Sequence, residues 1–192
     1  IGVVKIVQEH AALIAARELA REPGSTIIHN LITSWSVPEV VREHGGLPVR
    51  TRVGHSFIKA TMRKHGAVFG GELSGHFYFK DNHTCDSGVI AMVSALNRLS
   101  ASKAPLSALV EDLRRYHSTG EINFHVEDKA AAIASLKRTY AGGRQDELDG
   151  ITVEFGDLGR GAWWWFNVRA SNTEPLLRLN LEASDAGLRD EK

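Results

Sequence analysis

Residues 26–51 read TIIHNLITSWSVPEVVREHGGLPVRT and carry the signals of a strand, a helix and a second strand in succession. The short apolar run 26–30 has the length of a buried strand. Pro38 suits the first turn of a helix, and the following glycine pair ends that helix before a second strand at 47–51. A helix between two short strands predicts parallel pairing through a right-handed crossover.

The same alternation continues on both sides of this stretch. Apolar residues at helical spacing predict helices at 12–20 and 56–64, and a third strand starts at 68–69 before a glycine pair interrupts it. Asp86 is a suitable N-cap for one more helix. We therefore predict an α/β domain over residues 1–100, with a mostly parallel sheet and crossover helices. The residues expected to face inward on the last helix are Val89, Ile90, Val93 and Leu96.

The second half of the chain has a different pattern. Residues 100–105 are small and polar and end in proline, which predicts a linker. Residues 177–183 alternate between apolar and polar side chains, which is typical of a half-buried strand. We predict a smaller α+β domain with an antiparallel sheet over residues 106–192. Further strands are expected at 121–126, 151–155 and 162–169, and further helices from 106 and after Asp128.

Composition excludes several classes of protein. The 192 residues carry 23 Lys plus Arg and 23 Asp plus Glu, so the formal net charge is zero, whereas proteins that bind nucleic acid usually carry a basic excess. Cys85 is the single cysteine, so it cannot form an intrachain disulfide, and we expect it to be a small buried or half-buried hydrophobe. No apolar run approaches the roughly 18 residues that cross a bilayer.

The densest polar cluster is residues 169–175, Arg-Ala-Ser-Asn-Thr-Glu-Pro, which lies between two predicted strands. Successive backbone N–H groups in such a turn can form an anion-binding nest. The Ser171 and Thr173 hydroxyls add donors, and the planar guanidinium of Arg169 matches phosphate oxygens. From composition alone, an ordinary polar hairpin in which Asn172 tolerates left-handed geometry is the favoured alternative.

A second cluster is residues 70–76, Gly-Gly-Glu-Leu-Ser-Gly-His, at the carboxyl end of a predicted strand, where α/β sheets present ligand sites. If this backbone stays extended, Glu72, Ser74 and His76 point to one side. They could then hold sugar hydroxyls, with His76 moving a proton near neutral pH. A bulged strand with a solvated polar face is an equally good interpretation.

A third candidate is Gly-His-Ser at 54–56, where a helix is predicted to start. A purely structural interpretation is favoured, in which Ser56 is an N-cap, His55 is structural and Lys59 is solvated. A helix N-terminus can nevertheless attract phosphate.

The nine histidines are scattered and include no His-Glu-x-x-His motif, so we expect no metal site built by this chain. The run Trp163–Trp165 alternates between two faces of a strand, which favours packing over base or sugar stacking.

Four segments together resemble one known family. In order, they are Gly-His-Ser-Phe-Ile-Lys (54–59), Gly-Gly-Glu-Leu-Ser-Gly-His-Phe-Tyr-Phe (70–79), Asp-Ser-Gly (86–88) and Arg-Ala-Ser-Asn-Thr-Glu-Pro (169–175). The chain from about residue 12 to 184 is similar to the α-D-phosphohexomutases, specifically phosphomannomutase/phosphoglucomutase. The resemblance is to the third and fourth of the family's four domains.

The resemblance implies an intramolecular phosphotransferase that interconverts hexose 1-phosphate and hexose 6-phosphate through a phosphoserine and a bisphosphorylated sugar. It assigns the sugar 3- and 4-hydroxyls to Glu72 and Ser74. The catalytic candidates are His76 and His55. His76 would be a contact or proton-transfer group, and His55 would line the same cleft. Positioning and charge neutralisation carry most of phosphoryl-transfer catalysis. The residues that would grip the phosphate that is not reacting are Arg169, Ser171, Asn172 and Thr173.

The sequence also departs from the family pattern. The serine motif of the first domain and the Mg²⁺ loop Asp-Gly-Asp-x-Asp-Arg of the second are absent from the 192 residues. Ile32 stands close to the position where the family commonly has Lys or Arg, which puts one cationic contact in doubt. The chain also starts at Ile1 rather than Met. We therefore expect the C-terminal fragment of a cytoplasmic, Mg²⁺-dependent enzyme, inactive without its N-terminal domains.

Two other hypotheses remain from the sequence. One is a stand-alone module that senses sugar phosphate in a mutase-like cleft, and the other is an unrelated histidine-based metallohydrolase, which would need bound zinc. The sequence does not distinguish mannose phosphate from glucose phosphate as the substrate, because both sugars share the hydroxyls assigned to Glu72 and Ser74.

Overall fold

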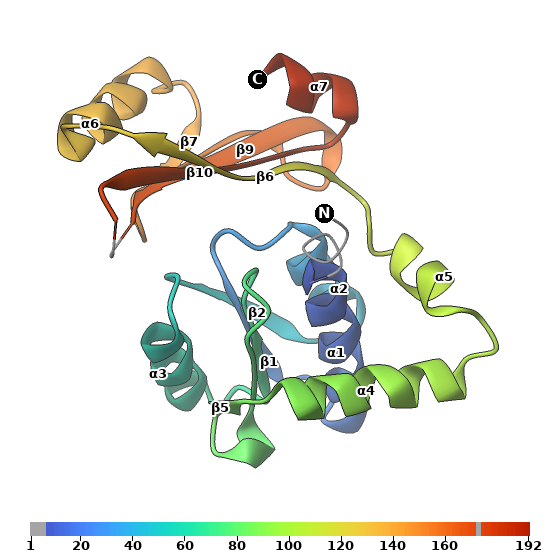
Figure 1. Ribbon diagram of the computed structural model, residues 1–192. Coiled ribbons are helices and arrows are strands. Elements are labelled where there is room, and N and C mark those ends of the chain that lie inside the picture. The colour runs from blue at the N-terminus through green and yellow to red at the C-terminus, as the bar shows by residue number, and fades with distance from the viewer. Residues whose placement is uncertain (1–6, 172–173) are drawn as a thin grey trace. The chain divides into compact units, whose positions relative to one another are not determined.

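The computed structural model describes residues 7–171 and 174–192, and the chain divides into two units between Arg115 and Tyr116 (Figure 1). The first unit is an α/β domain and the second is an α+β domain with an antiparallel sheet. The predicted fold class is therefore confirmed. No helix of the described part of the chain is long and apolar enough to cross a membrane.

The sheet of the first unit has the strand order β2-β1-β3-β4-β5. Strand β1 lies between β2 and β3 and pairs in parallel with both, while β3, β4 and β5 follow one another as antiparallel neighbours. The three parallel strands therefore end at one edge of the sheet. The strands are β1 (Thr26–Asn30), β2 (Leu47–Thr51), β3 (Phe69–Gly71), β4 (Phe77–Phe79) and β5 (Cys85–Asp86).

Helices cover both faces of this sheet. Neighbouring residues of β1 point to opposite sides, so Ile27 joins a core cluster with α1 and α2, and Ile28 joins a second cluster with Ile58 and Met62 of α3. Both isoleucines are fully buried, as expected for a central parallel strand. The helices are α1 (Val7–Arg21), α2 (Ser36–Glu43), α3 (His55–His65), α4 (Gly88–Ala101) and α5 (Leu106–Glu111), with a 3₁₀ turn η2 (Lys80–Asn82).

Two details of the first unit differ from the sequence-based expectation. Gly70 does not interrupt β3 but lies inside it, where a Cβ atom would come within 3.0 Å of the Met62 sulfur, so glycine lets α3 pack closely. The N-cap of α4 is Ser87, whose hydroxyl accepts the Ile90 N–H at 3.2 Å, and not Asp86. The inward face of α4 is also different, since it consists of Ala91 and Ser94 with Ile90 packed beside them. Val89, Val93 and Leu96, which were expected inside, are exposed.

The sheet of the second unit has the order β6-β10-β9-β8-β7, and all its pairs are antiparallel. One face packs under α6, where Trp164 stacks on Phe155 and contacts the ring of Tyr140. Trp163 and Trp165 are buried on the other face. The elements are β6 (His117–His125), α6 (Lys129–Thr139), β7 (Arg144–Asp146), β8 (Ile151–Asp157), β9 (Arg160–Ala170), β10 (Leu176–Ala183) and α7 (Ala186–Glu191).

The division between the units falls after α5, whereas the sequence pattern placed it at residues 100–105, with domains of 1–100 and 106–192. Contacts explain the difference. Leu113 packs against the core of the first unit, and Arg114 and Arg115 make ion pairs to α1 and α2. The polar stretch after α4 is thus a turn between two helices of the same unit.

Candidate functional site

Polar residues gather at the carboxyl edge of the parallel strands in the first unit. Asn30 and Thr51 are the last residues of β1 and β2, and Glu72 directly follows β3. Because these strands are parallel neighbours, their ends lie at the same edge, which is where open α/β sheets bind ligands. The three side chains are nonetheless almost fully buried, at 1% to 5% exposure.

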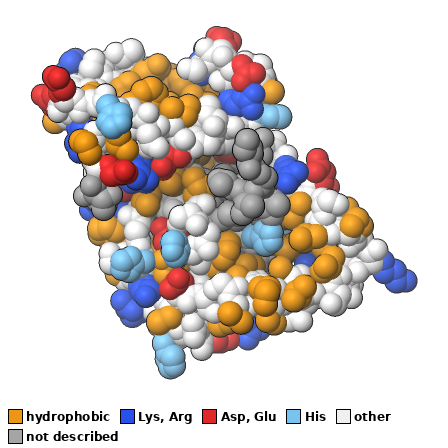
Figure 2. Space-filling view, viewed as in Figure 1, with side chains coloured by type: hydrophobic (Ala, Val, Ile, Leu, Met, Phe, Trp, Pro, Cys, Tyr) orange, Lys and Arg blue, Asp and Glu red, His pale blue; other side chains and the backbone are white. Residues whose placement is uncertain are grey.

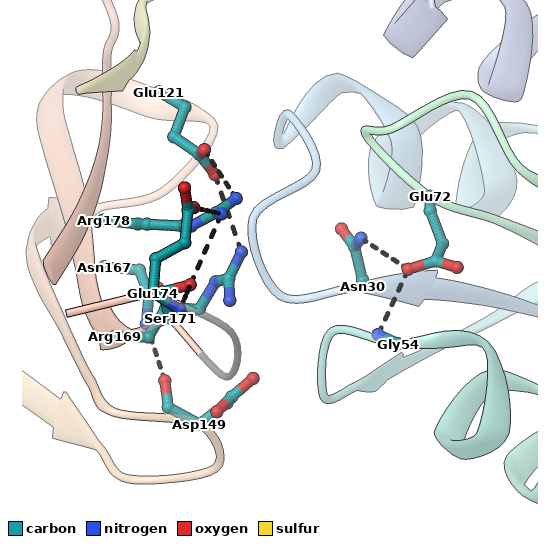
Figure 3. A network of polar contacts seen from close by, with 10 residues as sticks. All are labelled: Asn30, Gly54, Glu72, Glu121, Asp149, Asn167, Arg169, Ser171, Glu174 and Arg178. Atoms are coloured by element: carbon teal, nitrogen blue, oxygen red, sulfur yellow. Dashed lines mark hydrogen bonds and ion pairs between the residues drawn. The ribbon is translucent and has the colours of Figure 1, made fainter. Parts of the chain in front are cut away.

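Glu72 is the centre of this group (Figure 3). Its Oε1 accepts the Tyr78 hydroxyl at 2.6 Å. Its Oε2 accepts the backbone N–H of Gly54 at 3.2 Å and the Asn30 side-chain amide at 3.5 Å. Burying a carboxylate is costly unless hydrogen bonds compensate for lost water, and these donors provide that compensation.

The sequence pattern singled out Glu72 and, separately, the segment that contains Gly54, but it did not predict that the donors around Glu72 are Asn30, Gly54 and Tyr78. They come from three separate segments, and each belongs to a type that is common outside functional sites. Asn30 carried one weak signal, since it is a polar residue at the end of a buried strand. Its orientation is also fixed, because its side-chain oxygen accepts the Thr33 hydroxyl at 2.6 Å.

Ser74 and His76 form a pair in the loop between β3 and β4. The Gly75 N–H donates to the Glu72 carbonyl at 3.1 Å, and Gly75 has a φ of 88°, so the chain turns sharply here. Of the two interpretations left open, the extended backbone with Glu72, Ser74 and His76 on one side is therefore not the one observed. The Ser74 hydroxyl lies 2.9 Å from His76 Nδ1 and both residues are exposed, whereas Glu72 is buried.

His55 begins α3 directly after Gly54, the residue whose N–H binds Glu72. The N-cap of this helix is Gly54, with a φ of 128°, and not Ser56 as expected. His55 and Ser56 are exposed. The Lys59 ammonium lies 5.9 Å from the centre of the Tyr78 ring, so this lysine is near the Glu72 network rather than simply solvated.

Two buried titratable groups of this region have shifted pKa values. Burial, followed by the hydrogen bond to Glu72, raises the pKa of Tyr78 well above its ordinary value, so its hydroxyl remains a donor at neutral pH. Burial lowers the pKa of His29 from 6.5 to about 4, so this imidazole is neutral at pH 7. Ile32 lies where the family resemblance led us to expect Lys or Arg, and it is buried at 6% exposure.

The second candidate group lies where β9 turns into β10 in the second unit (Figure 3). Arg169 and Ser171 are each 6% exposed. The Ser171 hydroxyl accepts the Glu174 N–H at 3.2 Å, and the Ser171 N–H donates to the Leu176 carbonyl at 2.9 Å. The other two predicted phosphate-binding residues, Asn172 and Thr173, lie outside the described residues.

Arg178 is a residue of this group that sequence analysis missed. It lies directly opposite Arg169 in the β9–β10 register. Its guanidinium donates to Glu121 at 3.0 Å, to Glu174 at 2.9 Å and to the Ser171 hydroxyl at 3.4 Å, while Glu121 also lies 3.6 Å from Arg169. Like charges opposite each other destabilise a sheet, and here the carboxylates of Glu121 and Glu174 offset the two neighbouring guanidinium charges.

A tight contact supports the base of this loop. Gly150, in the turn before β8, has a φ of 72°, and a Cβ atom there would come within 2.2 Å of the Val168 carbonyl and 2.7 Å of Arg169 Cα. The side-chain amide of Asn167 donates to the Asp149 and Ile151 carbonyls at 3.0 and 3.3 Å. The turn and the end of β9 are therefore held together by backbone packing.

Across residues 7–171 and 174–192, no group of three or more His, Cys, Asp or Glu residues is placed to hold a metal ion. Cys85 is exposed, which corrects the expectation of a buried or half-buried residue.

Comparison with known proteins gives matches over most of the chain. Residues 8–116 match the family model "Phosphoglucomutase/phosphomannomutase, alpha/beta/alpha domain III", and residues 121–191 match the model of the C-terminal domain of the same family. The chain is 42% identical over 181 residues to the "Phosphohexose mutases" protein of Xanthomonas campestris. It is 39% identical over 181 residues to a phosphomannomutase of Methanocaldococcus jannaschii.

A solved structure supports the same relationship. A phosphoglucomutase/phosphomannomutase family protein from Burkholderia thailandensis is similar with a TM-score of 0.81 and 31% sequence identity, over 96% of this chain. The matches cover 92% and 94% of this chain for the Xanthomonas and Methanocaldococcus proteins. The chain spans only 39% of the length of each of these three relatives.

Proposed function

The chain belongs to the phosphoglucomutase/phosphomannomutase family, and on this premise we propose that it is the sugar- and phosphate-recognising part of a phosphohexomutase. The enzyme would interconvert hexose 1-phosphate and hexose 6-phosphate through a phosphoserine and a bisphosphorylated sugar. The observation that carries the proposal is the buried, hydrogen-bonded Glu72 carboxylate at the carboxyl edge of the sheet.

In the first unit, Glu72 would accept a hydrogen bond from a sugar hydroxyl, and Ser74 would contact a second one. The Ser74 contact orients the His76 ring through Nδ1 and leaves Nε2 as the nitrogen available to move a proton. His55, exposed at the start of α3 beside Gly54, would line the same site. The substrate would be a mannose phosphate or a glucose phosphate.

In the second unit, Arg169, Ser171, Asn172 and Thr173 would bind the phosphate that does not react. Arg178 would join them as a second cation. An incoming phosphate would replace Glu121 and Glu174 as the partner of these arginines, since guanidinium groups bind phosphate oxygens in a bidentate way. Binding and charge neutralisation are the steps that the residues of this chain would perform.

Mg²⁺ dependence is part of the proposal for the whole enzyme but not for this chain. The described side chains do not fit a Mg²⁺ site, because none of them form the oxygen-rich cluster that the ion requires. The metal and the phosphoserine would belong to a part of the enzyme that is not in the 192 residues. We further propose that the enzyme acts in the cytoplasm, where hexose phosphates are its partners.

A binding experiment tests this proposal. The 192-residue chain is titrated with mannose 1-phosphate, glucose 1-phosphate and inorganic phosphate while its amide signals are followed by NMR. We expect weak binding of all three, loss of all three in Arg169→Ala, and a selective but still measurable weakening of sugar-phosphate binding in Glu72→Gln.

Two results would contradict the proposal. One is the absence of any sugar-phosphate binding at millimolar concentration. The other is interconversion of mannose 1- and 6-phosphate by the isolated chain, which would show that it needs no further domains.

A further inference from the structure

Tyr78 combines two features that a core aromatic residue does not need together. Its ring is fully buried in the cluster formed by Ile28, Ile58 and Met62, and its hydroxyl reaches out of that cluster to Glu72 Oε1 at 2.6 Å. A phenylalanine would fill the same space without a polar group. The hydroxyl therefore contributes a hydrogen bond to Glu72 that the packing of the ring does not require.

The number of hydrogen-bond acceptor sites on the Glu72 carboxylate shows how many remain open to a ligand. A carboxylate offers about four acceptor sites, two on each oxygen. The Gly54 N–H and the Asn30 amide occupy Oε2, and the Tyr78 hydroxyl occupies one site of Oε1. Among the described residues this leaves one site, on the oxygen that Tyr78 holds.

We propose that Tyr78 is a positioning residue for Glu72, and that its hydroxyl fixes the carboxylate so that Oε1 accepts a single sugar hydroxyl. The proposal rests on the proposed function for the sugar contact itself. Gly54 and Asn30 hold only the other oxygen, so removing the Tyr78 hydroxyl leaves Oε1 without a protein donor and lets the carboxylate plane tilt about Oε2, which moves the open site. A fixed acceptor loses less conformational freedom on binding than a free one.

The variant Tyr78→Phe removes only the hydroxyl and keeps the buried ring. In the 192-residue chain we expect the dissociation constant of mannose 1-phosphate to rise about tenfold, as for a lost hydrogen bond to a charged group, while that of inorganic phosphate stays the same. The matched control is Tyr140→Phe, which removes a ring hydroxyl in the second unit and should change neither constant. Equal affinity of wild type and Tyr78→Phe for mannose 1-phosphate would overturn the proposal.

The double variant Glu72→Gln/Tyr78→Phe separates positioning from general damage to the fold. If Tyr78 acts through Glu72, its substitution has little further effect on mannose 1-phosphate binding once the carboxylate is gone. Independent, additive losses would mean that Tyr78 supports the fold alone, and would refute the positioning role.

A measurement without ligand keeps this inference apart from the proposed function. In protein labelled with ¹³C at glutamate side chains, the relaxation order parameter of the Glu72 Cγ group should fall in Tyr78→Phe and stay unchanged in Tyr140→Phe. An unchanged order parameter in Tyr78→Phe would disprove the positioning role even if the chain binds sugar phosphate. A lowered order parameter in a chain that binds no sugar phosphate would support positioning and reject only the proposed function.

Discussion

The candidate sites are formed by ordinary residue types, and their tertiary contacts distinguish them from the same residues elsewhere in the chain. Glu72 is 3% exposed, and its carboxylate is tolerated inside the unit because a tyrosine hydroxyl, a backbone N–H and an asparagine amide donate to it. Arg169 and Arg178 are likewise adjacent only through the strand register. Neither arrangement can be derived from residue spacing, since the partners are brought together by the tertiary fold.

At the residue scale, Gly150 offers a direct test of how the phosphate loop is supported. Gly150→Ala places a methyl group within 2.2 Å of the Val168 carbonyl and forces alanine to adopt a φ of 72°. We expect the second unit to lose about 3 kcal/mol of stability, combining the left-handed backbone with the steric clash. Urea unfolding followed by tryptophan fluorescence measures this, because Trp163, Trp164 and Trp165 all lie in that unit.

The control for this substitution is Gly142→Ala. No atom lies within 4 Å of a Cβ built at Gly142, and its φ is not in the left-handed region. We expect the control to change stability by less than about 0.5 kcal/mol. Equal effects of the two substitutions would show that the close approach of Gly150 to β9 is not a constraint on the loop.

Among the elements, strands were predicted more accurately than helix faces. The bounds of β1 and β2 agree with the sequence pattern, because short apolar runs between glycine, proline and polar residues have few alternatives. The α4 helix was predicted at about the right place, but of its four residues expected inward only Ile90 packs against the core. A helical period shows which residues share a face, but it does not show whether anything covers that face.

The exposed apolar stripe of α4 is the clearest departure from a simple amphipathic pattern. Val89, Met92, Val93 and Leu96 are 45% to 67% exposed, and they follow the i, i+3, i+4, i+7 spacing of a single face. In Figure 2 hydrophobic side chains gather at the lower right, where Figure 1 shows α4. The small residues Ala91 and Ser94 occupy the inward side, because α1 and α4 pack together there.

At the element scale, two identical substitutions distinguish the two faces. Leu96→Ala should change the stability of the first unit by less than about 0.5 kcal/mol, because its side chain is already half in water. Leu19→Ala in α1 should cost about 2–5 kcal/mol, since Leu19 is 2% exposed and its loss leaves a cavity. Thermal or urea unfolding measures both. A large loss of stability in Leu96→Ala would instead support the inward-facing position that the sequence pattern predicted for Leu96.

At the scale of the whole molecule, the chain consists of two units with separate cores. Each of the three hydrophobic clusters takes its residues from one unit only, with Ile27 and Ile28 in clusters of the first and Ile151 in the cluster of the second. Cores that share no residues can unfold separately. We therefore expect the chain to show two unfolding transitions, which one global free energy would not describe.

His29 gives these two transitions different responses to acid. Its imidazole is buried in β1, and burial lowers its pKa to about 4, whereas in the unfolded chain it takes up a proton near pH 6.5. Between these values the unfolded state binds more protons, so the stability present above pH 6.5 falls as the pH drops towards 4. This contribution acts on the first unit alone, because His29 lies in β1 of its sheet.

The expected loss is about 2 kcal/mol for the first unit between pH 7 and about pH 4.5 from this group alone. Comparing wild type with His29→Gln by calorimetry at both pH values isolates it, since other titrating groups are common to the two proteins. The variant should lose about 2 kcal/mol less than wild type in the first transition, and the second transition should shift equally in both. The same acid response in wild type and His29→Gln would mean that His29 is already protonated in the folded sheet.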